Sequence, residues 1–177
     1  LRRYDADLNI TANWKNPNDI TSPVYIVPHL AVDLSGYVYF SDSAAKLIRK
    51  FSSDLVNIQN FNASGAGGFG SSGPAGLAVD PDGNIFAADP DKNRVLKLSN
   101  SGQLITIITG SDIASPKGLN RPTSVAVNRD GLLFVSDTGN NRVQAFEKRM
   151  VVPASTTTTT MKPRPILPRT IIRPKAR

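Results

Sequence analysis

The sequence predicts an all-β fold, an arc of about three four-stranded propeller blades with a disordered C-terminal tail. The first observation is an internal repeat, because residues 74–98 recur at 122–146 and a weaker copy occupies residues 27–51. The second is that short β-branched and aromatic runs alternate with turn residues, with no helical pattern between them. Four short strands in each 47- to 48-residue unit are typical of propeller blades, which pack on their neighbours.

The clearest copy defines its strands by residue type. Residues 77–80 form the first expected strand, and the turn 80–83 follows, with Pro at its second position and Gly at its fourth. The second strand, 84–89, is apolar on both faces, as expected for a strand that is covered on both sides. Residues 94–98 and 103–109 complete the blade.

Three sets of residues recur in register and are predicted to be structural. They are the turn glycines Gly36, Gly83 and Gly131, the second-strand acids Asp42, Asp89 and Asp137, and the arginines Arg94 and Arg142. Opposite charges at the two stems of a hairpin can pair across the ladder, which contributes about 0.2–1 kcal/mol. The first copy breaks this rule, because Leu47 stands in the arginine position with Lys46 beside it.

The repeat also predicts how the chain is divided. Tyr4 aligns with Phe51, Leu98 and Phe146, so the chain is expected to begin inside the third strand of a blade, as a fragment of a larger propeller would. The predicted units are the end of a preceding blade with its connection (1–26), two blades (27–73 and 74–121), a blade with an incomplete outer strand (122–150), and a Thr/Pro-rich basic tail (151–177).

Composition limits the function classes. The 177 residues contain no Cys, which excludes a disulfide framework and a thiolate zinc site. No apolar run is long enough to cross a bilayer. Residues 1–147 hold 13 Lys and Arg against 14 Asp and Glu, whereas residues 148–177 hold 8 and none. The blades are therefore almost neutral, and the net charge of +7 resides in the tail.

The two strong copies resemble the NHL repeat. Residues 74–98 and 122–146 share its Pro at the start, its Ala-Val before the first turn, its Gly at the turn, its Asp at the end of the second strand and its Asn-Arg before the third. NHL propellers usually close with about six blades. The resemblance therefore implies that further blades exist or that two copies self-associate to complete one ring, since an arc exposes apolar sheet faces.

The first function hypothesis is a binding scaffold. The acids follow the repeat in register, which turn chemistry explains, so we expect no catalytic residue, metal or cofactor in this chain. Partners would be proteins or other extracellular ligands bound through the propeller loops. Nucleic acid is not an expected partner, because the blades lack the basic surface that binds phosphates.

Two alternatives come from the resemblance. Some NHL-like propellers are peptidylglycine amidating lyases, which hold a metal through histidines at the starts of several blades. This chain has one such histidine, His29, with Gly76 and Ser124 in the corresponding positions, so the other ligands would have to lie in missing blades. The second alternative is an RNA-binding or ubiquitin-ligase-associated NHL domain.

The sequence contains three further motifs. Residues 65–70 satisfy the dinucleotide pattern G-x-G-x-x-G, but no strand and helix flank them as that motif requires, so we interpret them as a loop between blades. Asn9 and Asn62 begin sequons for N-glycosylation. Together with the Thr/Pro-rich tail, they favour an extracellular or cell-surface location over a cytoplasmic one.

Overall fold

A computed structural model describes residues 1–13, 29–110 and 118–147. The tail predicted at 151–177 lies outside the described residues. The chain begins with an antiparallel N-terminal sheet of two strands, β1 (Arg2–Tyr4) and β2 (Ile10–Asn13). No helix in the described part of the chain is long and apolar enough to span a membrane.

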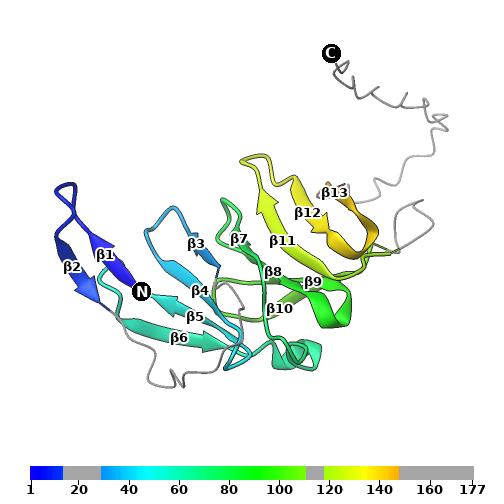
Figure 1. Cartoon of the computed structure of the whole chain (residues 1–177), viewed down its shortest axis with the longest axis horizontal. Coiled ribbons are helices and arrows are strands. Elements are labelled where there is room, and N and C mark those ends of the chain that lie inside the picture. Colours follow the sequence, from blue (N-terminus) through cyan, green and yellow to red (C-terminus); the bar gives the residue numbers. More distant parts are fainter. Residues whose placement is uncertain (14–28, 111–117, 148–177) are drawn as a thin grey trace, which may run out of the picture.

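Three antiparallel sheets follow, side by side in an arc (Figure 1). Blade 1 comprises β3 (Leu30–Val32), β4 (Val38–Asp42), β5 (Leu47–Phe51) and β6 (Asn57–Phe61). Blade 2 comprises β7 (Leu77–Val79), β8 (Ile85–Asp89), β9 (Arg94–Leu98) and β10 (Leu104–Ile108). The described strands of blade 3 are β11 (Pro122–Val127), β12 (Leu133–Asp137) and β13 (Arg142–Phe146).

Sheet order within the blades follows chain order, so each strand pairs with the next one in sequence. The first strand of blade 2, β7, contacts the first strands β3 and β11 of the neighbouring blades, so the three first strands lie innermost in the arc. Three short 3-10 helices, η1 (Ser64–Ala66), η2 (Pro90–Lys92) and η3 (Thr138–Asn140), lie in connections. The predicted all-β partial propeller is confirmed.

The core lies between the blades, because side chains alternate across each strand. One face of blade 2 packs on blade 1 through Leu77, Ile85, Ala87, Leu96 and Leu98. The other face packs on blade 3 through Ala78, Phe86, Ala88 and Val95. Blade 2 is thus covered on both sides, which explains why its second strand is apolar on both faces.

The first turn of each blade is built on a side-chain acceptor. Asp80 Oδ1 accepts the Asn84 N–H at 2.8 Å, and the Gly83 N–H donates to the Asp80 carbonyl at 2.9 Å. The turn needs a positive φ at its fourth position, which glycine adopts without strain. Gly83 has φ 79°, and Gly36 and Gly131 have 83° and 82°.

The connection from blade 1 to blade 2 carries part of the core. Its composition predicts a surface loop over residues 62–73, yet Ala63 and Phe69 are buried in the cluster between these two blades. The expectation was wrong for these two residues. Their burial means that this loop packs as part of the sheet-to-sheet interface.

Cations on third strands link neighbouring sheets. Arg3 Nη1 of the N-terminal sheet donates to the Ser53 carbonyl at 2.7 Å and contacts the Asp54 carboxylate at 2.8 Å. At the next repeat, Lys50 Nζ of blade 1 donates to the Asn100 carbonyl of blade 2 at 3.3 Å. The same position in two successive sheets therefore reaches the turn between the third and fourth strands of the next blade.

The backbones of blades 2 and 3 lie close together at Gly76. Its N–H donates to the Thr123 carbonyl at 3.0 Å. A Cβ at Gly76 would lie 2.6 Å from the Ser124 Cα, a backbone atom that cannot move aside without shifting the strand. Glycine at this position thus sets the distance between the two blades.

We expect Gly76→Ala to lower the free energy of unfolding by about 1–3 kcal/mol, because the added methyl group overpacks the interface between blades 2 and 3. Urea denaturation followed by circular dichroism would measure this loss. Gly65→Ala is the matched control, since its Cβ would make only an ordinary 3.4 Å contact with Leu104. Equal stabilities for the two variants would contradict the close approach.

Candidate functional site

The repeated acid and arginine of blade 2 form a buried clamp. Arg94 Nε donates to Asp89 Oδ2 at 2.9 Å, and the Gly70 N–H donates to Asp89 Oδ1 at 3.0 Å. The guanidinium also donates to the carbonyls of Ala66 at 2.9 Å and Gly68 at 2.6 Å. Both members of the pair thus bind the loop that leads into blade 2.

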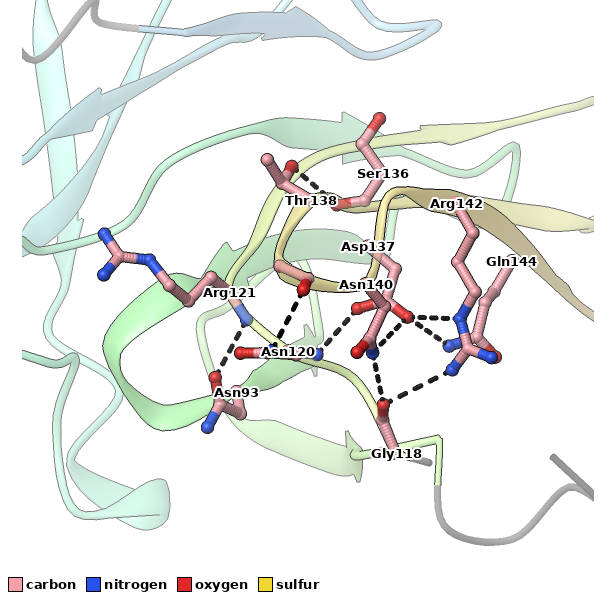
Figure 2. Close-up of polar contacts among 11 residues, drawn as sticks. Asn93, Gly118, Asn120, Arg121, Ser136, Asp137, Thr138, Asn140, Arg142 and Gln144 are labelled. Atoms are coloured by element: carbon pink, nitrogen blue, oxygen red, sulfur yellow. Dashed lines mark hydrogen bonds and ion pairs between the residues drawn. The ribbon is translucent and has the colours of Figure 1, made fainter. Parts of the chain in front are cut away.

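Blade 3 repeats this clamp with more donors (Figure 2). The Asn120 N–H donates to Asp137 Oδ1 at 2.6 Å. Asp137 Oδ2 accepts hydrogen bonds from Asn140 Nδ2 at 2.9 Å, Arg142 Nε at 2.7 Å and Gln144 Nε2 at 2.7 Å. Both carboxylate oxygens are occupied, and the residue is fully buried.

The blade 3 clamp also holds the carbonyls of its incoming loop. The Gly118 carbonyl accepts Asn140 Nδ2 at 2.9 Å and Arg142 Nη2 at 3.4 Å. The Gly139 N–H donates to the Asn120 carbonyl at 2.8 Å. The hairpin of blade 3 therefore replaces the strand partner that this segment of the loop lacks.

Burial acts to raise the pKa of Asp137. The Asn120 amide and the side chains of Asn140, Arg142 and Gln144 outweigh this effect and lower the pKa to about 2. Hydrogen bonds from four donors stabilise the charged form. This carboxylate remains ionised near neutral pH and is not poised to transfer a proton.

Blade 1 has a clamp that the sequence did not predict. Leu47 pairs with Asp42 in the ladder, as the repeat requires, but Arg49 Nε donates to Asp42 Oδ2 at 2.7 Å. Residues two apart on a strand share a face, so an arginine at 49 reaches the same carboxylate as one at 47 would. The prediction that the first copy lacks a pair of an acid and an arginine was therefore wrong.

An asparagine beside each arginine position of blades 2 and 3 has left-handed backbone geometry. Asn93 has φ 50°, and Asn141 has φ 51°. Asn93 Oδ1 accepts the N–H of Arg121 from the start of blade 3 at 2.8 Å (Figure 2). Asn93 thus makes a polar link from one blade to the next.

The first turns of the three blades converge on one pocket of about 130 Å³. It is lined by residues 32–34 of blade 1, 79–81 of blade 2 and 127–129 of blade 3. We call it the axial pocket, because it lies at the ends of the innermost strands. Its walls are mostly apolar and include Leu34, a residue that is 88% exposed.

The charged groups of the axial pocket differ in how they are paired. Asp33 Oδ1 accepts the Ser35 N–H at 2.9 Å, and Asp80 forms an ion pair with Lys97 at 3.2 Å. Burial acts to raise the pKa of Asp80, but hydrogen bonds from Asn84 and the pairing with Lys97 lower it. Arg129 has no ion-pair partner within the described part of the chain, so this cation is available to a ligand.

His29 lies immediately before β3. Its N–H donates to Ser41 Oγ at 2.8 Å, and its carbonyl accepts the Ser41 N–H at 3.0 Å. Within residues 1–13, 29–110 and 118–147, no group of three His, Cys, Asp or Glu side chains could hold a metal ion. Among the described residues, His29 is therefore not part of a three-ligand metal site.

The backbone carbonyls of the glycine-rich loop 65–70 accept hydrogen bonds from a lysine side chain. Lys92 Nζ donates to the carbonyls of Gly67 at 2.8 Å and Gly68 at 3.0 Å. A phosphate-binding loop instead presents N–H groups at the start of a helix. The loop therefore has the wrong polarity for a dinucleotide and serves to anchor blade 2.

Both sequon asparagines are exposed, Asn9 between β1 and β2 and Asn62 directly after β6. Asn9 Nδ2 lies within 3.3 Å of the Asp5 carboxylate, and Asn62 Oδ1 accepts the Ser64 N–H at 3.1 Å. The two side chains are accessible from solvent in the folded chain.

Comparison with known proteins agrees with this geometry. Residues 119–146 match the NHL repeat family, and residues 35–116 match the SMP-30/gluconolactonase/LRE-like region family. No curated protein sequence matches the chain.

Several solved structures share the fold. Virginiamycin B lyase from Staphylococcus aureus is 16% identical with a TM-score of 0.58, over 84% of this chain and 48% of that one. A streptogramin B lyase is 19% identical with a TM-score of 0.56, over 81% and 46%. The WD40 β-propeller domain of Doa1 is 21% identical with a TM-score of 0.52, over 70% and 37%.

The matched segments span less than half the length of these three structures. Together with the arc of sheets, the likeness defines the chain as a partial β-propeller. The family match at residues 119–146 is to one repeat of the NHL type, the repeat that forms blade 3.

We expect Asp137→Asn to lower the free energy of unfolding by about 3–5 kcal/mol, because it removes the charge that Arg142 pairs with and turns a donor toward donors. Urea denaturation would measure the loss. Asp130→Asn is the control, since Asp130 is exposed in the first turn of the same blade and should change stability by less than about 0.5 kcal/mol.

The pH dependence of stability gives this prediction a second readout. The pKa of Asp137 is lower in the folded chain than its ordinary value of 3.8, so its stabilisation is complete above that value and is lost as the pH falls toward 2. The contribution is about 2 kcal/mol. The wild-type chain should lose it between pH 4 and 2, and Asp137→Asn should not. Identical acid profiles would contradict the clamp.

Proposed function

We propose that the chain is a non-catalytic interaction module that binds a protein segment in the axial pocket. The observation that carries the proposal is that the acids at the repeated positions are paired within the fold, whereas apolar groups and an arginine at the pocket remain open to a ligand. Asp42, Asp89 and Asp137 bind arginines and blade loops, whereas the pocket presents exposed apolar groups and an arginine without a described partner.

The chemistry of the pocket suggests the kind of segment it would bind. Val32 and Leu34 are 60% and 88% exposed, so an apolar side chain would remove apolar surface from water on both partners. The guanidinium of Arg129 can bind a carboxylate through two parallel hydrogen bonds. The fitting ligand is therefore a peptide with an apolar residue next to an acidic one.

Binding can be tested with a displayed library of 12-residue peptides that is selected on the wild-type chain. Fluorescence anisotropy would then give dissociation constants for the selected peptides. We expect Leu34→Asp to weaken binding about tenfold or more, since it places a charge in the apolar part of the pocket. Arg129→Glu should weaken binding of the acidic peptides to a similar extent.

Ile105→Asp is the matched control, because Ile105 is 50% exposed on β10, the outermost strand of blade 2. It should bind the selected peptides as the wild-type chain does. If all three variants bind equally well, the axial pocket is not the binding site.

We further propose that the module is extracellular and carries N-linked glycans on Asn9 and Asn62. The exposure of both asparagines supports this proposal. On expression in a secreting eukaryotic cell, peptide N-glycosidase should lower the mass by two glycans, and each Asn→Gln substitution should remove one. A secreted chain without a mass change would contradict it.

A further inference from the structure

The face of blade 3 that points away from blade 2 carries exposed apolar side chains. We call it the outer face of blade 3 and define it by Ala126, Phe134, Val143 and Ala145. Phe134 is 38% exposed and Val143 is 67% exposed. Side chains of this kind are usually covered in a monomeric protein when they lie next to one another on a sheet.

The repeat shows what covers this face elsewhere in the same chain. In blade 2, Phe86 and Val95 occupy the positions of Phe134 and Val143, and they are only 4% and 0% exposed because blade 3 packs on them. The residues in the two blades are identical in type. The difference in exposure therefore reflects that no sheet among the described residues packs on blade 3 from this side, and not a change in the face.

Blade 1 follows the same rule. Tyr39 and Ile48 hold these positions and are both 0% exposed beneath blade 2. Two of the three equivalent faces are thus interfaces with a following blade, and the third keeps their apolar character. Ala145 replaces the cation that Lys50 and Arg3 carry at this position, which makes the third face more apolar still.

Asn141 of blade 3 stands at the position of Asn93, the residue that links blade 2 to blade 3. Asn141 has the same left-handed conformation as Asn93, whose side chain accepts the Arg121 N–H of the next blade. The side chain of Asn141 forms no hydrogen bond with a described residue, and it is exposed. The acceptor that blade 2 uses toward blade 3 is therefore presented again, beside the outer face.

The N-terminal sheet, at the opposite end of the arc, exposes a side chain at a position that packs on the preceding blade elsewhere in the chain. Tyr4 of the N-terminal sheet aligns with Phe51 and Leu98, which are both 0% exposed, and Leu98 packs in the cluster that blade 2 shares with the preceding blade. Tyr4 itself is 48% exposed. One end of the arc thus exposes residues that pack on a following blade, and the other exposes a residue that packs on a preceding one.

We propose that two copies of the chain associate head to tail, with the outer face of blade 3 of each copy against the N-terminal sheet of the other. The second copy is the fitting occupant because each copy exposes, at opposite ends of its described arc, the two surfaces that pack together between blades 2 and 3. The two contacts are identical by two-fold symmetry, and the ring closes without further copies.

Light scattering and sedimentation equilibrium on the 177-residue chain test this assembly. We expect a mass of about twice 19.0 kDa for the wild-type chain and a shift to 19.0 kDa for Val143→Glu. A charge at Val143 would lose its hydration in the contact, whereas the side chain is exposed in a single copy. Far-UV circular dichroism would check that the variant remains folded.

Ile105→Glu is the control, since Ile105 is comparably exposed on β10, away from both ends of the arc. It should remain dimeric. A monomeric wild-type chain would overturn the proposal, as would a dimer that Val143→Glu leaves intact. Coverage of the outer face by residues 148–177 of the same chain would give the monomeric result.

Disulfide trapping tests the head-to-tail orientation. The natural chain has no Cys, so single variants carry no background thiol. When Tyr4→Cys and Val143→Cys are mixed and mildly oxidised, we expect the mixed disulfide to form faster than it does for the control mixture of Ile105→Cys and Val143→Cys. Preferential pairing of Val143→Cys with itself would indicate face-to-face packing of two blades 3 and would overturn the orientation.

Discussion

The described segments of the loops that lead into blades 2 and 3 belong to no sheet, and a buried carboxylate with its arginine supplies hydrogen-bond partners for their backbone. Asp89 and Asp137 accept N–H groups of their incoming loops, while the arginines that pair with them donate to loop carbonyls. A buried backbone group without such a partner would cost free energy comparable to a lost hydrogen bond. The clamp thus determines where the first strand of the blade begins, and hence where its first turn lies.

Because of this constraint, the functional groups of the chain fall into two sets, those that hold the blade loops and those that a ligand can reach. The oxygens of Asp137 are occupied by donors from one loop and one hairpin, and its low pKa keeps it charged. A carboxylate held in this way stabilises the fold and offers no free oxygen to a substrate or metal. The groups that remain available to a ligand are on the turns at the axial pocket, where Arg129 and Leu34 lie.

The sequence predicted the fold because the relevant signals are local. The turn at Gly83 and the third strand Arg94–Leu98 follow from a few neighbouring residues, and the structure has them as expected. The pairing of Asp42 with Arg49 was missed because alignment to the repeat pointed to residue 47. Gln144, which stands at the position of Arg49 and also donates to its acid, was the signal that could have revealed it.

The burial of loop residues and the axial pocket could not be predicted from the sequence, because both depend on how the blades pack on one another. Phe69 lies in a loop of glycines and serines, and only the packing of two blades makes it a core residue. The axial pocket likewise forms from three turns that are 47 or 48 residues apart, none of which has a ligand-binding motif. A pocket of this kind depends on the angle between blades, which no single repeat encodes.

The axial pocket and the outer face of blade 3 are related by the geometry of a ring. If two copies close one ring head to tail, the two-fold axis runs along the propeller axis, and both axial pockets open at the same end of the assembly. A partner with two copies of the recognised segment could then occupy both pockets at once. Its second binding step would be intramolecular, so its apparent affinity would exceed that of a single peptide by an amount set by the linker between the segments. Closure of the ring would in this way raise the apparent affinity for a partner with two recognised segments, without any change in the pocket itself.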